Sequence, residues 1–268
     1  MSQVKAKKHL GQHFLTDKNI AEKIVNSLSQ LHLYDKVLEV GPGMGVLSDF
    51  LLQKTAYETY LIDIDAESVA FLKDKYPALQ DRLLHADFLH LDFKTVFPSK
   101  FAIIGNFPYN ISSQILFKLL DNRNQVPEVV GMFQKEVAER LTAKAGSKVY
   151  GILSVFLQAY YKCEYLFTVK PGVFNPPPKV LSAVIRLTRN EVETLDCNEK
   201  LFWQVVKAGF NQRRKTLSNA LSGIIPKEKQ DENEVWTLRA ERLTVKDFVE
   251  LTNSVTLALF KGEGNINT

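Results

Sequence analysis

The side chains best suited to chemistry lie in the tetrapeptide Asn106-Phe107-Pro108-Tyr109, directly after the aliphatic run Phe101–Gly105. Such a run predicts a buried strand that ends at a turn. The Asn106 side-chain carbonyl and a backbone carbonyl at Phe107 or Pro108 could accept hydrogen bonds from the NH2 group of a planar heterocycle. The proline fixes its own φ and so the direction of that carbonyl, and the Tyr109 ring could stack on the heterocycle. The alternative is an ordinary turn, with Tyr109 packed inside.

A glycine-rich segment, Glu39-Val40-Gly41-Pro42-Gly43-Met44-Gly45, lies between a predicted strand and a predicted helix. Glycines there allow a tight turn and the close approach of a ligand to the backbone. Asp63 and Asp65 end the next predicted strand, about 20 residues later, where a carboxylate can bind the two hydroxyls of a ribose. These features suit a site for either NAD or S-adenosylmethionine.

Two further features favour S-adenosylmethionine. Pro42 removes a backbone N–H from the place where a pyrophosphate would need donors. The third predicted strand ends in Ala86-Asp87-Phe88, an acid to accept from an adenine amine and an apolar neighbour to lie against the ring. Ligands of such folds bind at the carboxyl ends of the strands. Four successive predicted strands end at candidate ligand-binding residues: Gly41, Asp63, Asp87 and Asn106.

The elements that must position these residues alternate along the chain. Strands are predicted over 36–40, 59–64, 82–86, 101–105 and 128–133, and helices over 17–30, 46–54, 66–76, 112–120, 134–143 and 151–158. This alternation predicts a parallel sheet covered on both faces. Segments 160–169 and 181–188, joined by a proline-rich loop, predict an antiparallel pair at the sheet edge. The expected fold class is α/β, with a Rossmann-like sheet.

The patterns divide the chain into three parts. Residues 1–16 predict a flexible basic arm that ends in Gly11-Gln12-His13-Phe14-Leu15, and residues 17–189 the Rossmann-like domain. From residue 190 the apolar spacing becomes helical, which predicts a small all-helical domain over 190–268. The apolar positions that carry this period are Leu201, Val205, Phe210, Phe248, Leu251, Val255 and Leu259.

Composition excludes several classes of protein. The 268 residues are 45% hydrophobic and 24% charged, as in an ordinary soluble globular protein. We expect no membrane span and no secretory signal, since no run of 18 apolar residues occurs and no apolar segment follows the basic start. Cys163 and Cys197 lack C-x-x-C spacing, which argues against a metal site and fits a reducing, cytoplasmic environment.

Basic residues are unevenly distributed, although the net charge is only +4. No acid precedes Asp17, and none lies between Glu199 and Glu228. Two acid-free basic segments are what a polyanion-binding surface requires. The alternative is a solvated tail and a solvated helix face. The basic residues of interest are Lys7, Lys8, Arg213, Arg214 and Lys215.

On these motifs the chain resembles the KsgA-type small-subunit (16S) ribosomal RNA adenine dimethyltransferases, from about Lys7 to Leu259. The resemblance also rests on Gln134–Val137, Tyr150–Val155 and Phe174–Val180. A last motif, Phe210–Leu217, is specific to this group and is matched less well by the related large-subunit enzymes.

The resemblance implies S-adenosylmethionine-dependent dimethylation of two adjacent adenosines in the 3′-terminal stem-loop of small-subunit rRNA, in a pre-30S particle, by a monomer. It implies that Tyr109 and Phe174 sandwich the flipped adenine, while the basic arm and the Arg213–Lys215 segment follow RNA phosphates. His13 stands where Asn is frequent in the family, Phe107 where Leu or Ile is frequent, and Asp63 where Glu is frequent. The expected cofactor contacts are Gln12, His13, Leu15, Gly41, Gly43, Asp63, Asp87, Phe88 and Asn106.

Three alternatives remain open at the level of sequence. The first is the same chemistry on large-subunit rRNA, as in antibiotic-resistance enzymes. The second is a non-catalytic nucleic-acid-binding factor on the same fold, which would need neither the intact tetrapeptide nor Asp87. The third is an NAD-dependent oxidoreductase, which Pro42 disfavours.

Overall fold

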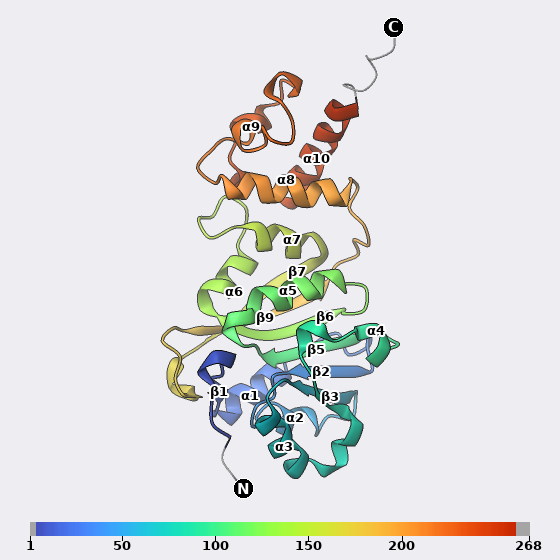
Figure 1. Cartoon of the computed structure of the whole chain (residues 1–268), viewed down its shortest axis with the longest axis vertical. Helices are drawn as coiled ribbons and strands as arrows, with labels where there is room; N and C mark the ends of the chain where they lie inside the picture. The colour runs from blue at the N-terminus through green and yellow to red at the C-terminus, as the bar shows by residue number, and fades with distance from the viewer. Residues whose placement is uncertain (1–3, 261–268) are drawn as a thin grey trace. The chain divides into compact units, whose positions relative to one another are not determined.

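The computed structural model describes residues 4–260 (Figure 1). The chain divides into two compact units. The first combines Met1–Ala138 with Tyr161–Asn190, and the second combines Glu139–Tyr160 with Glu191–Thr268. Residues 1–3 of the predicted arm and 261–268 of the predicted helical domain lie outside the described residues.

The first unit is built on one seven-stranded sheet of order β4-β3-β2-β5-β6-β9-β7 (Figure 1). From β4 to β6 neighbouring strands are parallel, and β9 runs antiparallel to both β6 and β7. The α/β fold with an antiparallel edge is therefore confirmed. The strands are β2 (Lys36–Val40), β3 (Glu58–Asp63), β4 (Leu83–His85), β5 (Phe101–Asn106), β6 (Glu128–Gln134), β7 (Tyr161–Val169) and β9 (Ser182–Arg189).

Helices connect the parallel strands, as the alternation predicts. They are α2 (Ser48–Leu51), α3 (Ala66–Lys75), α4 (Phe93–Val96) and α5 (Ser112–Asp121), while α1 (Lys18–Val25) precedes these strands and α6 (Lys135–Thr142) follows them. Short 3-10 segments used below are η1 (Lys8–Leu10), η3 (Phe88–His90) and η4 (Tyr109–Ile111). Asp17 caps α1 as predicted, since its carboxylate accepts from the Ile20 N–H at 3.0 Å.

One core cluster of the first unit lies where α1 and α2 cover a face of the sheet. Ile24 of α1 and Leu51 of α2 are both fully buried against the strands. The strand residues of this cluster include Val37, Ala102, Ile104, Val130, Met132 and Val184. Burial of the strand side chains is why these segments appear as near-continuous apolar runs in the sequence.

The N-terminal arm differs from its prediction. Phe14–Leu15 forms a short strand, β1, that pairs antiparallel with β8 (Phe174–Asn175). Leu15 and Phe174 are register partners and both are buried in the core cluster described above. Burial of Leu15 and this backbone pairing fix the end of the arm on the first unit, whereas the sequence predicts a flexible segment over 1–16.

The second unit is helical within its described residues. Its helices are α7 (Ile152–Tyr160), α8 (Glu199–Asn211), α9 (Leu217–Ala220) and α10 (Val245–Phe260). The sequence assigns 139–160 to the Rossmann-like domain, but the structure groups this segment with the C-terminal helices. The reason is the apolar surface of α7, where the Phe156 ring lies 3.7 Å, centroid to centroid, from Trp203 of α8. No helix within residues 4–260 meets the length and hydropathy of a membrane span.

A buried carboxylate fixes the connection between α1 and the sheet. Glu128, at the start of β6, is fully buried. It accepts from the Ser29 N–H at 3.0 Å, the Gln30 N–H at 2.9 Å and the Tyr34 hydroxyl at 2.7 Å. Burial and the hydrogen bond to Glu128 raise the pKa of Tyr34, so that its hydroxyl stays a donor. The backbone of residues 29 and 30 is used in these bonds, and α1 accordingly ends at Val25 instead of near residue 30.

We expect Glu128→Ala to lower the free energy of unfolding by about 3 kcal/mol, because several buried donors lose their acceptor together. Urea denaturation followed by circular dichroism measures this change as a shift in midpoint at constant slope. Glu22→Ala, at an exposed position of α1, is the control and should change stability by less than about 0.5 kcal/mol. Equal midpoints for the two variants would contradict the role given to Glu128.

Candidate active site

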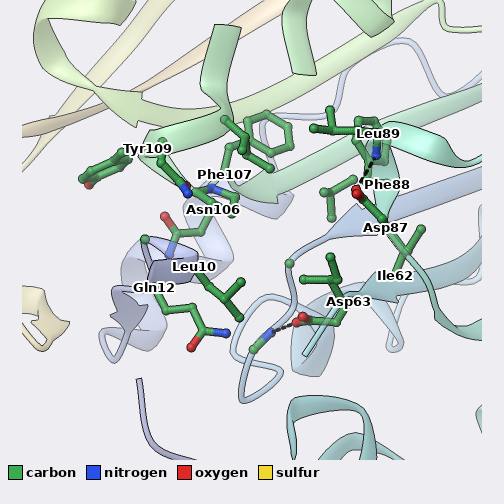
Figure 2. A pocket seen from close by; sticks show the side chains of 18 of the residues that line it. Leu10, Gln12, Ile62, Asp63, Asp87, Phe88, Leu89, Asn106, Phe107 and Tyr109 are labelled. Atoms are coloured by element: carbon green, nitrogen blue, oxygen red, sulfur yellow. Dashed lines mark hydrogen bonds between the residues drawn. The ribbon is translucent and has the colours of Figure 1, made fainter. Parts of the chain in front are cut away.

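A pocket of about 900 Å³, a volume that includes space open to solvent, lies at the carboxyl ends of β2, β3 and β5. The N-terminal arm supplies one of its walls (Figure 2). Most of the residues predicted for the site line it: Gln12, His13, Gly41, Gly43, Asp63, Asp87, Phe88, Asn106, Phe107, Pro108 and Tyr109. The structure therefore brings together segments that are up to about a hundred residues apart, in the arrangement that ligands of parallel α/β sheets use.

The glycine turn after β2 is shaped by backbone conformations that favour glycine. Gly41 and Gly43 have φ of 69° and 56°. A Cβ on Gly43 would lie 2.7 Å from carbon atoms of the Phe14 ring, so the arm can approach the turn only because this residue is glycine. The Gly43 N–H donates to Asp63 at 3.2 Å, which ties the turn to the end of β3.

Asp63, which is predicted to bind ribose hydroxyls, ends β3 and lines the pocket. Its carboxylate is buried and accepts from the N–H groups of Gly43 and Asp65, the latter at 2.9 Å. Burial raises the pKa of Asp63, and these backbone hydrogen bonds oppose that rise. Each oxygen accepts one of these bonds and retains capacity for another, so the carboxylate can still accept from ligand hydroxyls.

Asp65 has a different role, because its carboxylate binds two side chains of the N-terminal arm. Lys7 Nζ lies 2.5 Å from Asp65 Oδ1 and 3.1 Å from Glu67, while Gln12 Nε2 donates to Asp65 Oδ2 at 3.1 Å. Burial alone would raise the pKa of Asp65, but the bonds from Lys7 and Gln12 hold it below its ordinary value. Lys7 is thus engaged within the protein, which differs from its predicted contact with RNA phosphate, whereas Lys8 is exposed.

Asp87 lies at the far side of the pocket from the tetrapeptide (Figure 2). Its Oδ1 accepts from the Leu89 N–H at 2.8 Å, and its Oδ2 lies 2.8 Å from His90 Nδ1. The carboxylate is fixed but remains partly exposed, with 31% of the side chain accessible. An acceptor in this position matches the role predicted for the adenine end of a nucleoside-like cofactor.

Apolar side chains that the sequence did not single out also line the pocket. Leu10, Ile62, Ile64 and Leu89 all line it. Ile64 is 52% exposed, an unusual state for an isoleucine that follows a core strand, and such a side chain suits a planar ring laid against it. In the sequence, only the position of Ile64 between Asp63 and Asp65 could have indicated that it lines the site.

The tetrapeptide presents two free oxygens. Asn106 Nδ2 donates to the His13 carbonyl at 2.8 Å, which leaves Asn106 Oδ1 without a hydrogen bond from residues 4–260. The Pro108 carbonyl accepts from the Ile111 N–H and the Ser112 hydroxyl, each at 3.3 Å. The Phe107 carbonyl accepts no hydrogen bond within the same described range. Of the two carbonyls that the sequence left open, Phe107 is therefore the available one.

The Phe107 side chain is structural. It is buried to 1% exposure and packs on Phe133 at a centroid distance of 5.0 Å. Gly131 makes room for it, because a Cβ there would lie 2.2 Å from the Phe107 ring. Since the ring is held in the core, residue 107 can act on a ligand through its backbone.

Tyr109 and Phe174 do not form a facing pair in this structure. Tyr109 lines the pocket, with its hydroxyl 2.5 Å from Ser182 Oγ, and burial raises its pKa. Phe174 is buried in the core beside Leu15 and does not reach the lining. Leu15 likewise lies in the core instead of at the predicted cofactor contact. The ring beside Tyr109 is that of His13, at a centroid distance of 5.5 Å.

Beneath the glycine turn lies a second buried acid. Glu39, in β2, is 2% exposed and accepts from the Ser48 hydroxyl at 2.5 Å. Burial raises its pKa to about 8, against the opposing effect of the Ser48 bond. No cluster of side chains suited to hold a metal ion occurs within residues 4–260.

Comparison with known proteins places the chain among rRNA-modifying enzymes. The sequence model of the ribosomal RNA adenine dimethylase family matches residues 3–259. The chain is 58% identical over 256 residues to the ribosomal RNA small subunit methyltransferase A of Cytophaga hutchinsonii, covering 96% of this chain and 99% of that protein. The protein of the same name from Flavobacterium johnsoniae is 55% identical, with 95% and 97% covered.

Solved structures agree with this result. The dimethyladenosine transferase from Plasmodium falciparum aligns with a TM-score of 0.74 and 26% identity over 94% of this chain and 98% of that chain. The 23S rRNA methyltransferase ErmE aligns with a TM-score of 0.69 and 24% identity over 90% and 99%. The second likeness concerns the fold alone.

The raised pKa of Glu39 predicts that the free energy of unfolding depends on pH. Its pKa is about 8 in the folded protein and 4.5 as an ordinary carboxyl, so between these values the folded state keeps a proton that the unfolded state has lost. We expect its contribution to the free energy of unfolding to fall as the pH rises through this window, by up to about 1.4 kcal/mol per pH unit. Urea denaturation between pH 5 and 9 measures the curve.

Glu39→Gln separates this contribution from that of other groups, because a glutamine keeps an acceptor for Ser48 without titrating. The stability of the variant relative to the unsubstituted protein should therefore increase from about pH 5 to about pH 8. Glu22→Gln, exposed on α1, is the control. Parallel curves for Glu39→Gln and the unsubstituted protein would show that Glu39 does not titrate in this range.

Proposed function

Because the chain belongs to the ribosomal RNA adenine dimethylase family, we propose that it dimethylates N6 of two adjacent adenosines in the 3′-terminal stem-loop of small-subunit rRNA. Relatives above 50% identity, named small-subunit methyltransferases, support this substrate over large-subunit rRNA. The observation that best supports this reaction is the orientation of the Asn106 amide. Its nitrogen donates to the His13 carbonyl, and its oxygen is left free to accept from the substrate amine.

S-adenosylmethionine fits the residues of the pocket. Asp63 offers a carboxylate for ribose hydroxyls, and Asp87 an acceptor beside apolar side chains that suit an adenine ring. The glycines after β2 leave the turn open to a ligand, and Pro42 makes the same turn a poor site for a pyrophosphate. When bound, S-adenosylmethionine supplies a methyl group on a sulfonium, so that the leaving group needs no acid.

The tetrapeptide holds the amine that receives the methyl group. Asn106 Oδ1 and the Phe107 carbonyl oxygen are the free acceptors at the end of β5, and together they can accept both N–H bonds of an exocyclic NH2. Such acceptors orient the nitrogen for attack and stabilise the positive charge that grows on it. No acid lies within the tetrapeptide, so we assign the final proton to water.

A base can reach this pocket only outside a helical stack. Extrusion costs a few kcal/mol, and stacking on an aromatic ring returns about 1–3 kcal/mol per base. Tyr109 is the ring on the lining that can provide this stack. Phe174, the second ring implied by the family resemblance, would have to leave the core to contribute, since it is 4% exposed.

We further propose that exposed basic residues bind RNA phosphates. Arg214 and Lys215, between α8 and α9 in the second unit, are exposed. Arg213 is partly held within its unit, since its guanidinium donates to the Lys148 carbonyl at 2.5 Å. It also lines a hollow in the second unit together with further cations: Lys148, Arg239 and Arg242. With Lys8 on the arm, Arg213–Lys215 form the proposed phosphate contacts.

The pre-30S particle as the substrate, a monomeric state and a cytoplasmic location belong to the same proposal. The experiment that tests it is methyl transfer to small-subunit particles purified from an unmethylated strain, followed by mass spectrometry of the rRNA. Naked small-subunit and large-subunit rRNA are the comparison substrates. Methylation of large-subunit rRNA alone would replace the proposed substrate, and binding of RNA without transfer would favour a non-catalytic factor.

Asn106→Ala should lower turnover by at least about 100-fold, because the amide both holds N6 and meets its developing charge. Cofactor affinity, measured by calorimetry, should change far less than turnover. Asn26→Ala, an exposed asparagine at the end of α1, is the matched control and should keep full activity. Turnover of Asn106→Ala above about a tenth of the control, or roughly 1.4 kcal/mol, would remove Asn106 from its proposed role.

Arg214→Glu with Lys215→Glu should weaken binding to small-subunit particles and flatten its salt dependence. Each phosphate that the protein no longer neutralises lowers the slope of log K against log salt by about 0.7–0.9. Calorimetric titration with S-adenosylmethionine should be unchanged. The matched control reverses two exposed lysines of the first unit, Lys73→Glu with Lys94→Glu. Equal slopes for the two double variants would show that Arg214 and Lys215 are only a solvated surface.

A further inference from the structure

We propose that Ser182 and His13 are positioning residues that hold the Tyr109 ring as a fixed stacking platform for the target base. The proposal rests on the proposed function and adds residues to it. Ser182 lies outside the motif that carries Tyr109 and comes from the antiparallel strand β9, while His13 comes from the arm. Ser182 holds the ring at its hydroxyl, and the His13 ring lies beside it.

Ser182 is a rigid anchor. It opens β9, where its backbone is paired with Gln134 of β6 on one side and with Val169 of β7 on the other. Its side chain is fully buried, and its Oγ lies 2.5 Å from the Tyr109 hydroxyl. A strand held by two neighbours leaves little freedom to a short side chain such as serine, so the position of Ser182 Oγ is set by the sheet.

Tyr109, by contrast, begins a short 3-10 segment whose first turn lacks a side-chain cap. Its backbone carbonyl accepts from the Ser112 hydroxyl at 3.1 Å, and the ring itself is anchored at its hydroxyl by Ser182. The same bond satisfies both partners, since Ser182 Oγ has no other hydrogen-bond partner within residues 4–260. A buried hydroxyl that loses its partner is destabilised, which favours the bonded position of the ring.

The His13 ring lies beside the Tyr109 ring. The two ring centroids lie 5.5 Å apart with an angle of 30° between the planes. His13 Nδ1 lies 2.8 Å from the Pro176 carbonyl. A carbonyl can only accept, so Nδ1 carries the proton and the imidazole is held by the loop after β8. We assign the target base to the side of the Tyr109 ring that lines the pocket.

A fixed platform matters because stacking must place N6 against oxygens that are themselves fixed. A ring that rotates would stack on the base in orientations that do not bring its amine to Asn106 and Phe107, and misplacement of this kind lowers turnover. The competing explanation is that Ser182 is a buried serine that stabilises the fold and has no part in the reaction. The two explanations differ in how ring motion and turnover respond to the loss of the bond.

Ring motion of Tyr109 gives a test that does not depend on methyl transfer. We expect NMR of specifically labelled tyrosine to show one χ1 rotamer for Tyr109 in the unsubstituted protein, and averaging over rotamers in Ser182→Ala and His13→Ala, because the bond to Ser182 fixes where the hydroxyl end of the ring lies. His13→Phe restores a ring at this position and should restore the single rotamer. A single rotamer in both alanine variants would overturn the proposal, whatever the RNA substrate is.

Turnover links the platform to the reaction. Ser182→Ala and Tyr109→Phe each remove the same hydrogen bond, so each should lower kcat by about five- to tenfold and the double variant no further. Affinity for S-adenosylmethionine should stay within twofold. Ser154→Ala is the matched control, because Ser154 is equally buried and its hydroxyl donates to the Arg140 carbonyl at 2.5 Å; it should lower stability but leave kcat unchanged.

Two results distinguish a failure of the proposed function from a failure of the positioning proposal. If the unsubstituted protein transfers no methyl group to any rRNA, the proposed function fails, and the rotamer measurement still decides whether Tyr109 is held. If the unsubstituted protein is active and the losses in Ser182→Ala and Tyr109→Phe simply multiply in the double variant, or match that of Ser154→Ala, the serine has only a structural role and the proposal is overturned.

Discussion

The hydrogen bond from Asn106 Nδ2 to the His13 carbonyl is the interaction on which the site depends most. An amide side chain can turn either its nitrogen or its oxygen toward a ligand, and the surroundings decide which. A backbone carbonyl only accepts, so it assigns the nitrogen to His13 and leaves the oxygen for an amine. The same bond attaches the arm to the end of β5. One contact therefore closes part of the cofactor pocket and orients the group that would hold the substrate.

The arm explains why the site is not complete within the sheet. It is attached through the β1–β8 pair, through Lys7 and Gln12 at Asp65, and through His13 at Asn106. Each attachment uses a different kind of interaction: backbone pairing with apolar burial, an ion pair, and a single hydrogen bond. Between Lys7 and His13 lie arm residues that line the pocket, Leu10 among them. The sheet and the arm each supply part of the pocket lining, and the polar bonds at Asp65 and Asn106 hold the arm against the sheet.

Much of this could be predicted from the sequence, for a physical reason. Strands such as β5 are buried and appear as apolar runs that stop at glycine, so their ends and the residues placed there are visible. The sequence could not predict which residue a given side chain contacts in the folded protein. Lys7 has the same local signature whether it pairs with Asp65 or faces solvent, and Phe174 the same whether it faces the core or a cavity. For α7, the sequence predicted a helix correctly but assigned it to the wrong unit.

An asparagine at position 106 suits this site better than the isosteric aspartate would, for reasons visible in the contacts. A carboxylate could accept from the substrate amine equally well, but it could not donate to the His13 carbonyl, and two acceptors would then face each other. The arm would lose an attachment at the point where it meets the reacting group. The carboxylates on the pocket lining, Asp63 and Asp87, already accept backbone N–H bonds that fix them for other contacts. The site thus separates its charged groups, which suit a cofactor, from the neutral oxygens that receive the amine.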